Sequence, residues 1–99
     1  MIVQMDKKEG MVFMKVGEAF TVYEAAEIHG EMKKALETGQ GLVIDLSDLG
    51  EFDLTGIQIL CSASKSAKKA GKRFLIEDVH RDVLDAFFRA GVRLEDLMA

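Results

Sequence analysis

The residues best suited to chemistry lie in a short stretch between an expected strand and an expected helix. An apolar run ends at Asp45, as is typical of a buried strand, and a helical pattern opens near Thr55. A hydroxyl at a helix N-terminus meets unpaired backbone N–H groups and the positive end of the helix dipole. Thr55 can therefore cap the helix, which is worth about 1 kcal/mol, carry a phosphate, or do both; capping is the commoner role of such a residue.

Three nearby residues bear on either role of Thr55. Gly56 has no Cβ, so a backbone segment or a kinase can approach the hydroxyl closely. Asp53 is placed either to orient that hydroxyl or to cap the helix itself, and the spacing favours neither. Asp45 needs hydrogen-bond partners if it is buried, and the backbone N–H groups of the following loop are expected to supply them.

No other part of the sequence predicts catalysis. It contains no glycine-rich nucleotide loop, and no Ser-His-Asp or Cys-His set can be placed. His29 and His80 stand apart from any residue at metal-ligand spacing. Cys61 is interpreted as a small core residue, because free cysteines are commonly buried. We therefore expect a binding protein that is not an enzyme and needs no metal and no cofactor.

Composition restricts the classes of partner. The 99 residues are 48% hydrophobic and 30% charged, which suits one small domain with a single core. A net charge of −4 and a pI of about 5.1 argue against nucleic acid and anionic membranes as partners. The single cysteine indicates a reducing compartment, and we recognise neither a signal peptide nor a run long enough for membrane insertion. A cytoplasmic location is expected.

Hydrophobic periodicity predicts a single α/β domain in the order β-β-α-β-α-β-α. Its mixed sheet begins with an N-terminal β-hairpin that turns at residues 6–10, and helices are expected to pack mainly on one face. A capping box formed by Thr21 and Glu24 opens the first helix. The continuous apolar run of the third strand predicts burial on both faces, near the centre of the sheet. The expected elements are strands 1–5, 11–16, 42–46 and 73–77, and helices 22–38, 55–70 and 81–90.

Each expected helix has a side that should face the core. In the first helix this side is a narrow stripe opposite a charged face. The third helix is expected to turn Val83, Phe87 and Ala90 inward, with Leu84 and Phe88 beside them. The stripe of the first helix consists of Ala25, Ile28, Met32, Ala35 and Leu36.

The strand from Val43 to Ser47 and the loop and helix start at 52–57 resemble the STAS domain. This is the fold of the bacterial anti-sigma factor antagonists and of the cytoplasmic tails of sulfate transporters. The helix end at 69–72, the strand at 74–76 and the helix end at 88–92 follow in the family's order, so the resemblance covers most of the chain. Its sharp motif is the Asp-x-Thr-Gly sequence of residues 53–56. Residues 94–98 are expected to be all that corresponds to the family's usual last strand and helix.

The resemblance implies a phosphorylation-gated protein-binding switch. In such antagonists the hydroxyl residue before the glycine is phosphorylated by a partner that is both an anti-sigma factor and a serine/threonine kinase. Thr55 holds this position here, where the best-known antagonists have Ser. The expected partners are therefore such a kinase and a serine/threonine phosphatase, bound through residues 47–61. The implied switch and contact residues are Asp45, Ser47, Phe52, Asp53, Gly56, Ile57 and Cys61.

The same resemblance supports a second class of function. A STAS domain can be a constitutive scaffold subunit of a chemotaxis-type signalling assembly or of a membrane transporter, using the same surface without phosphorylation. Residues 55–63 are similar to stand-alone STAS proteins associated with chemotaxis-type signalling. The two hypotheses differ in whether Thr55 carries a phosphate in the cell.

Overall fold

Four strands form the main sheet of the protein, whose computed structural model describes residues 1–98. They are β1 (Ile2–Lys8), β2 (Met11–Val16), β4 (Gly41–Asp45) and β6 (Arg73–Glu77), in the order β1-β2-β4-β6. β1 pairs antiparallel with β2, whereas β2, β4 and β6 run parallel. This confirms the mixed sheet, the N-terminal hairpin and the interior position of the strand that ends at Asp45.

The hairpin turns later than its sequence predicts. β1 continues through residues 6–8, and the turn consists of Glu9 and Gly10 alone. Both residues have positive φ angles, 53° and 84°, as in a type I′ turn, whose twist matches that of the paired strands. The expected turn at 6–10 is therefore wrong in its length. The charged residues 6–8 suggest a turn, but charged side chains also occur on exposed edge strands, where they discourage aggregation.

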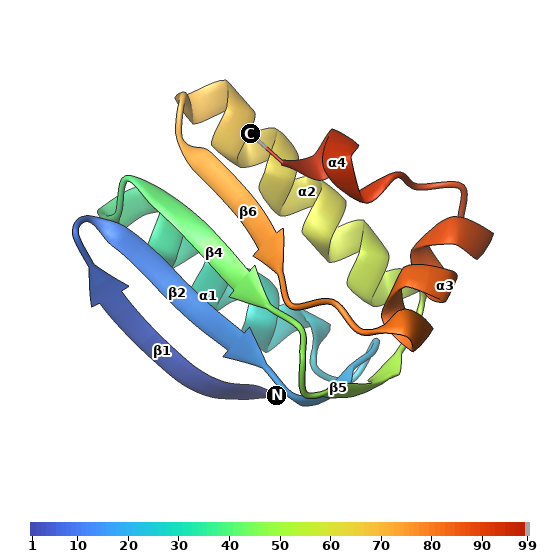
Figure 1. Cartoon of the computed structure of the whole chain (residues 1–99). Helices are drawn as coiled ribbons and strands as arrows, with labels where there is room; N and C mark the ends of the chain where they lie inside the picture. The colour runs from blue at the N-terminus through green and yellow to red at the C-terminus, as the bar shows by residue number, and fades with distance from the viewer. Residues whose placement is uncertain (99) are drawn as a thin grey trace.

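α1 (Ala25–Thr38) and α2 (Leu54–Ala70) lie next to each other on one face of the sheet (Figure 1). The buried residues of α1 are those of the predicted stripe. All of them except Ala25 share one core with the inward side chains of β2, β4 and β6. α2 ends at Gly71, whose φ of 70° allows the left-handed cap that commonly terminates a helix. The expected placement of both helices on one face is confirmed.

A separate turn precedes α1, so this helix begins at Ala25 and not at residue 22. The backbone N–H and the hydroxyl of Thr21 both donate to Glu24 Oε1 at 2.8 Å. This is one half of the predicted capping box. The other half differs, because the Thr21 hydroxyl accepts from the Tyr23 N–H at 3.3 Å instead of from the Glu24 N–H. Residues 21–24 therefore form a hydrogen-bonded turn in front of the helix.

A second, two-stranded sheet is absent from the sequence prediction. β3 (Glu18–Phe20) runs parallel to β5 (Leu49–Phe52). These strands have only three and four residues, show no clear alternation and pair across a long stretch of sequence. Counting them, the order of elements is β-β-β-α-β-β-α-β-α-α. The small sheet leads directly into the turn at 21–24 and into α2, so it positions both.

α3 (Arg81–Arg89) packs through a narrower side than expected. Val83 and Phe87 are buried, and the Phe87 ring lies 5.5 Å from the ring of Phe52 on β5, measured between centroids. This helix has nine residues and meets the edge of a two-stranded sheet, so it buries a single line of side chains. The expected inward placement of Ala90, with Leu84 and Phe88 packed beside it, is wrong. Exposed instead are Leu84, Phe88 and Ala90.

The short helix α4 (Leu94–Leu97) packs against α2 and β6. The Ser64 hydroxyl donates to the Leu97 carbonyl, and Lys68 Nζ donates to the Asp96 carbonyl at 2.5 Å. Buried Leu97 adds to the core. None of the helices in residues 1–98 combines the length and the apolar character that crossing a membrane requires.

Candidate functional site

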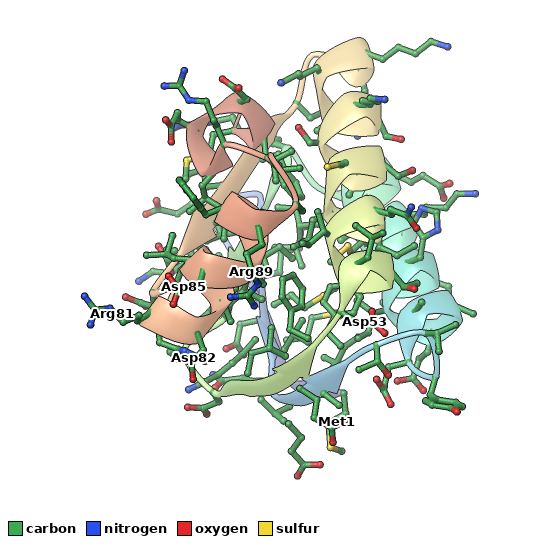
Figure 2. All side chains as sticks on the ribbon, turned by 90° about the vertical axis from the view of Figure 1, so that its right-hand side faces the viewer. Met1, Asp53, Arg81, Asp82, Asp85 and Arg89 are labelled. Carbon is green, nitrogen blue, oxygen red and sulfur yellow. The ribbon has the colours of Figure 1, made fainter. Side chains whose placement is uncertain are left out.

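Asp53 caps α2 and joins it to the turn in front of α1. Its Oδ1 accepts a hydrogen bond from the Gly56 N–H at 3.3 Å, the contact made by an N-cap residue. Its Oδ2 accepts from the Val22 N–H at 3.3 Å. Figure 2 shows Asp53 where β5 passes into the lower end of α2. Of the two roles that its spacing allowed, the structure shows capping, with a second bond that links two elements.

Thr55 is the second residue of α2 and is half-buried. Because Asp53 holds the cap position, the capping role expected for Thr55 is wrong. The hydroxyl lies in the first turn of the helix, beside N–H groups that have no partner within the helix and near the positive end of its dipole. The helix start therefore does not depend on this hydroxyl, which leaves it available for other chemistry.

Gly56 lets the first turn of α2 lie directly against the small sheet. A Cβ on this residue would lie 2.6 Å from Phe52 Cε1 and 2.7 Å from the backbone oxygen of Phe20. Real side chains do not approach this closely, so the position excludes every other residue unless the elements move apart. From the sequence, the glycine is expected to let a backbone segment or a kinase approach the Thr55 hydroxyl; the structure shows instead that the Phe20 backbone and the Phe52 ring lie close to Gly56 itself.

The apolar residues expected at the contact surface lie mainly beneath it. Ile57 is buried in the core, and its side chain is inaccessible to a partner in this structure. Phe52 is half-buried, with its ring 6.0 Å from Phe20 and 5.5 Å from Phe87 between centroids. Cys61 is half-buried and packs against the core. These side chains support the first turn of α2.

Three exposed apolar side chains near Asp53 are absent from the sequence prediction. Leu54 precedes Thr55, whereas Val22 and Tyr23 belong to the turn that the Asp53 carboxylate holds in place. Tyr23 is 91% exposed. An available signal was that neither Val22 nor Tyr23 falls on the buried stripe of α1. Large exposed apolar side chains beside a modifiable hydroxyl are suited to contacting a protein.

Asp45 and Ser47 stand at the other end of β5. The Asp45 Oδ1 accepts from the Ser47 N–H at 2.8 Å, which confirms that a backbone N–H of the following loop satisfies this carboxylate. Ser47 is exposed. The four residues of β5 separate this turn from Asp53, so the predicted site residues form two groups rather than one cluster.

The chain segments that meet around the start of α2 are rich in acidic residues, and Arg89 of α3 lines the same hollow as Asp53 and Leu54. Residues 16–28 contribute three acidic residues and residues 45–58 contribute four, and neither segment contains Lys or Arg. Hydrogen bonds from the Thr21 backbone N–H and hydroxyl lower the pKa of Glu24, which keeps its carboxylate charged in mild acid. The far end of α2 carries basic residues instead. The acidic residues of the two segments are Glu18, Glu24, Glu27, Asp45, Asp48, Glu51 and Asp53. Asp45 and Asp48 belong to the group at the other end of β5, where Asp48 is paired with Lys15.

The described chain offers no metal centre. Within residues 1–98, no three His, Cys, Asp or Glu side chains are grouped so that they could hold a metal ion. His80 contacts the Leu49 carbonyl through Nε2, which ties the start of α3 to β5. Its role is thus to join two elements.

The sequence matches one known protein family. The sequence model of the family described as “Mlab, STAS domain” matches residues 3–97. A comparison with curated proteins finds no match.

Several solved structures share the fold at low sequence identity. The RsbS protein of Moorella thermoacetica, in a variant with one serine changed to glutamate, has a TM-score of 0.78 and 23% identity, with 94% of this chain and 80% of that chain covered. A sulfate transporter family protein from Wolinella succinogenes has a TM-score of 0.76 and 22% identity, covering 93% and 75%. The unphosphorylated anti-sigma factor antagonist SpoIIAA has a TM-score of 0.73 and 10% identity, covering 86% and 80%. At such identities the likeness is one of fold.

Proposed function

The chain belongs to the STAS domain family, whose model spans residues 3–97, and from this we propose that it is a phosphorylation-gated protein-binding switch of the anti-sigma factor antagonist type. In this proposal Thr55 is the phosphoacceptor. A partner that is both an anti-sigma factor and a serine/threonine kinase binds the surface around it, and a serine/threonine phosphatase resets it. The protein acts by binding, without turnover of its own.

The proposal rests on one observation, that three residues in the first turn of α2 have separate roles. Asp53 caps the helix and Gly56 allows the close packing, so Thr55 remains as a hydroxyl with no part in the helix start. The exposed apolar side chains of Val22 and Tyr23 lie on the turn held by Asp53. A phosphate on Thr55 would therefore appear beside a surface suited to a protein contact.

The proposed switch is electrostatic. A phosphate adds about −1.5 to −2 charge at neutral pH, to a surface that already carries the carboxylates of Asp53 and Glu24. The helix dipole favours an anion at this position by roughly 0.3–1 kcal/mol, so the domain stays folded. The new charge must lose its water when apolar side chains such as Tyr23 meet the partner, and this cost weakens the contact. A coupling of about 1–3 kcal/mol suffices to change affinity by 5–150-fold.

Two solved structures of an anti-sigma factor antagonist with a similar fold support the proposal. SpoIIAA is an anti-sigma factor antagonist whose structure exists in an unphosphorylated form and, from Bacillus, in a phosphorylated form. The fold of the phosphorylated form matches this chain with a TM-score of 0.72 at 11% identity. A fold of this kind thus accommodates phosphorylation in that protein.

The test compares three variants against a kinase of the anti-sigma type from the producing organism. By calorimetry, Thr55→Ala should bind as the wild type does, and Thr55→Glu should bind at least five-fold more weakly. Gln58→Glu, at an exposed position one turn further along α2, is the matched control for added charge and should have a smaller effect. Phosphate on Thr55, found by mass spectrometry of the protein from its native cell, would support the switch. Equal affinities of the Ala and Glu variants would exclude it.

The alternative is a constitutive scaffold subunit of a chemotaxis-type signalling assembly or of a membrane transporter. The shared fold of the sulfate transporter family protein from Wolinella succinogenes keeps this class open. A scaffold would use the same surface without phosphate. Under this alternative, neither Thr55→Ala nor Thr55→Glu changes the output of the pathway beyond its effect on stability, and Tyr23→Ala still weakens assembly.

A further inference from the structure

One face of the main sheet has no layer of helices on it. α1 and α2 pack on the other face (Figure 1), where the alternate residues of β2, β4 and β6 form the core. These three strands run parallel, and parallel strands are normally covered on both faces. The uncovered face is therefore a candidate for contact with another molecule.

The strand register arranges the outward side chains of this face in three rows across the strands. Phe13 is 36% exposed, a large fraction for a phenylalanine inside a sheet. Val43 is only 4% exposed, because Phe13 and Leu75 flank it in register. A shallow hollow lies beside Phe13, between Lys15 and Asp45. The middle row consists of Asp6, Phe13, Val43 and Leu75.

The two outer rows carry opposite charge. The row at the start of the parallel strands includes Lys8 and Arg73, both exposed. The row at their ends includes Asp45 and Glu77. Lys15 also lies in this row, but its ammonium is 3.1 Å from Asp48 Oδ2, so its charge is already matched. The face is thus basic at one end, mainly apolar in the middle and acidic at the other end.

We propose that this face binds a second copy of the chain, with the strands of the two copies antiparallel. A twofold axis lying between the sheets and perpendicular to the strands places each strand over its own copy. β6 then sets Arg73 opposite Glu77 of the second copy, and the reverse pair follows by symmetry. The middle rows meet each other, and the hollow beside Phe13 leaves room for the ring from the second copy. Asp6 then faces its own copy, and this like-charged pair weakens the dimer at neutral pH. A twofold axis along the strands would instead set Arg73 opposite Lys8 of the second copy, two positive charges, so the charge on β6 favours the antiparallel arrangement.

The size of the face predicts a weak dimer. Four strands of about five residues cover a footprint of about 300 Å² per copy, well below the roughly 800 Å² per partner of stable complexes. The dimer should dissociate on dilution, and added salt should weaken it because charge pairs contribute to it. The face lies across the sheet from α2, so dimerisation leaves both copies of the Thr55 surface open.

Sedimentation equilibrium from micromolar to millimolar protein tests the proposal. The wild type should self-associate, and Arg73→Glu or Glu77→Arg should each weaken association by roughly tenfold, because each change turns two attractive pairs into repulsive ones. The double variant Arg73→Glu/Glu77→Arg recreates both pairs in reversed order and should recover the wild-type constant to within about threefold. Lys65→Glu, on the exposed side of α2, is the charge control and should have no effect.

Amide chemical shifts recorded against protein concentration locate the contact. The shifts of Phe13, Val43 and Leu75 should move with concentration, and those of the start of α2 should not. A wild type that stays monomeric at millimolar concentration overturns the proposal. The proposal is also overturned if both single charge reversals leave the association constant unchanged, or if the double variant does not restore the wild-type constant. Circular dichroism melts of each variant confirm that its fold is retained.

Discussion

At the scale of single residues, the first turn of α2 separates tasks that one residue could have shared. Asp53 supplies the cap and the bond to Val22. Gly56 supplies the space that Phe52 and the Phe20 carbonyl need. Other residues fulfil the structural roles in this turn, and Thr55 has none of them. A modification there can change the surface while the helix start stays intact, which is what a reversible switch requires.

The cap assignment predicts unequal costs for two neighbouring substitutions. Asp53→Ala should lower the free energy of unfolding by about 1–2 kcal/mol, because it removes the N-cap acceptor. Thr55→Ala should lower it by less than about 0.5 kcal/mol, because the hydroxyl is not the cap. Urea denaturation followed by circular dichroism measures both, and Asp53→Asn, which keeps an acceptor, should fall between them. A larger cost at Thr55 than at Asp53 would contradict the assignment.

Two glycines in helices provide a matched pair. In Gly56→Ala the new methyl group meets Phe52 and a backbone oxygen, so we expect a loss of about 1–3 kcal/mol in the free energy of unfolding. In Gly30→Ala, within α1, the methyl group has nothing within 4 Å, and better helix propensity should stabilise the protein by up to about 1 kcal/mol. Both effects appear as shifts of the urea midpoint in opposite directions. If Gly56→Ala raised the free energy of unfolding, this would contradict the close packing of Phe52 and the Phe20 backbone against Gly56.

At the scale of elements, the turn at 21–24 holds together parts of the fold that are distant in sequence. It follows β3, precedes α1 and is bonded to the start of α2 through Asp53. Inside it, the Glu24 carboxylate accepts from both the backbone N–H and the hydroxyl of Thr21. The geometry of the exposed Tyr23 therefore depends on a charged carboxylate.

This turn predicts a contribution to acid lability. The hydrogen bonds from Thr21 hold the pKa of Glu24 below its ordinary value of 4.5. A group whose folded pKa is lowered stabilises the fold above its unfolded pKa, and this stability is lost as the pH falls through the folded pKa. Glu24→Gln should therefore flatten the fall in melting temperature between about pH 5 and 3. Glu27→Gln, an exposed change in the first turn of α1, is the control. Equal pH profiles for wild type and Glu24→Gln would contradict the role of the carboxylate.

At the scale of the whole molecule, two surfaces are kept apart by the sheet. The surface around Thr55 and Asp53 lies at the start of α2, on the helical side, and the proposed self-association face lies on the other side. A dimer built through that face would carry two copies of the switch surface. Two linked sites bind a clustered partner more tightly than one site does.

The separation predicts that the two proposed activities are independent. Thr55→Glu should leave the self-association constant unchanged within about twofold, because the positions are distant and share no contact. Arg73→Glu should leave the affinity of a single kinase-type partner unchanged by the same measure. Sedimentation equilibrium and calorimetry on both variants provide the four values. A change in self-association caused by Thr55→Glu would show that the sheet transmits the effect of the charge.

Local patterns in the sequence predict much of this molecule correctly. The buried stripe of α1, the interior strand that ends at Asp45 and the extent of β6 all follow from periodicity or apolar runs inside one segment. Such patterns suffice because a helix or strand must repeat its apolar side toward the core. The bond from the Ser47 N–H to Asp45 was equally predictable, since its two residues are close together in the loop.

What the sequence left open depends on contacts between distant segments. Whether Asp53 or Thr55 caps α2, and what Gly56 makes room for, is settled by β3 and the turn at 21–24, which pack against that helix. The pairing of β3 with β5 and the exposure of Phe88 have the same origin. So do the charged rows on the bare face of the sheet, which exist only because the register of β1, β2, β4 and β6 aligns them. The free energy that stabilises these contacts comes from burial and close packing between elements, and no repeat within a single segment encodes it.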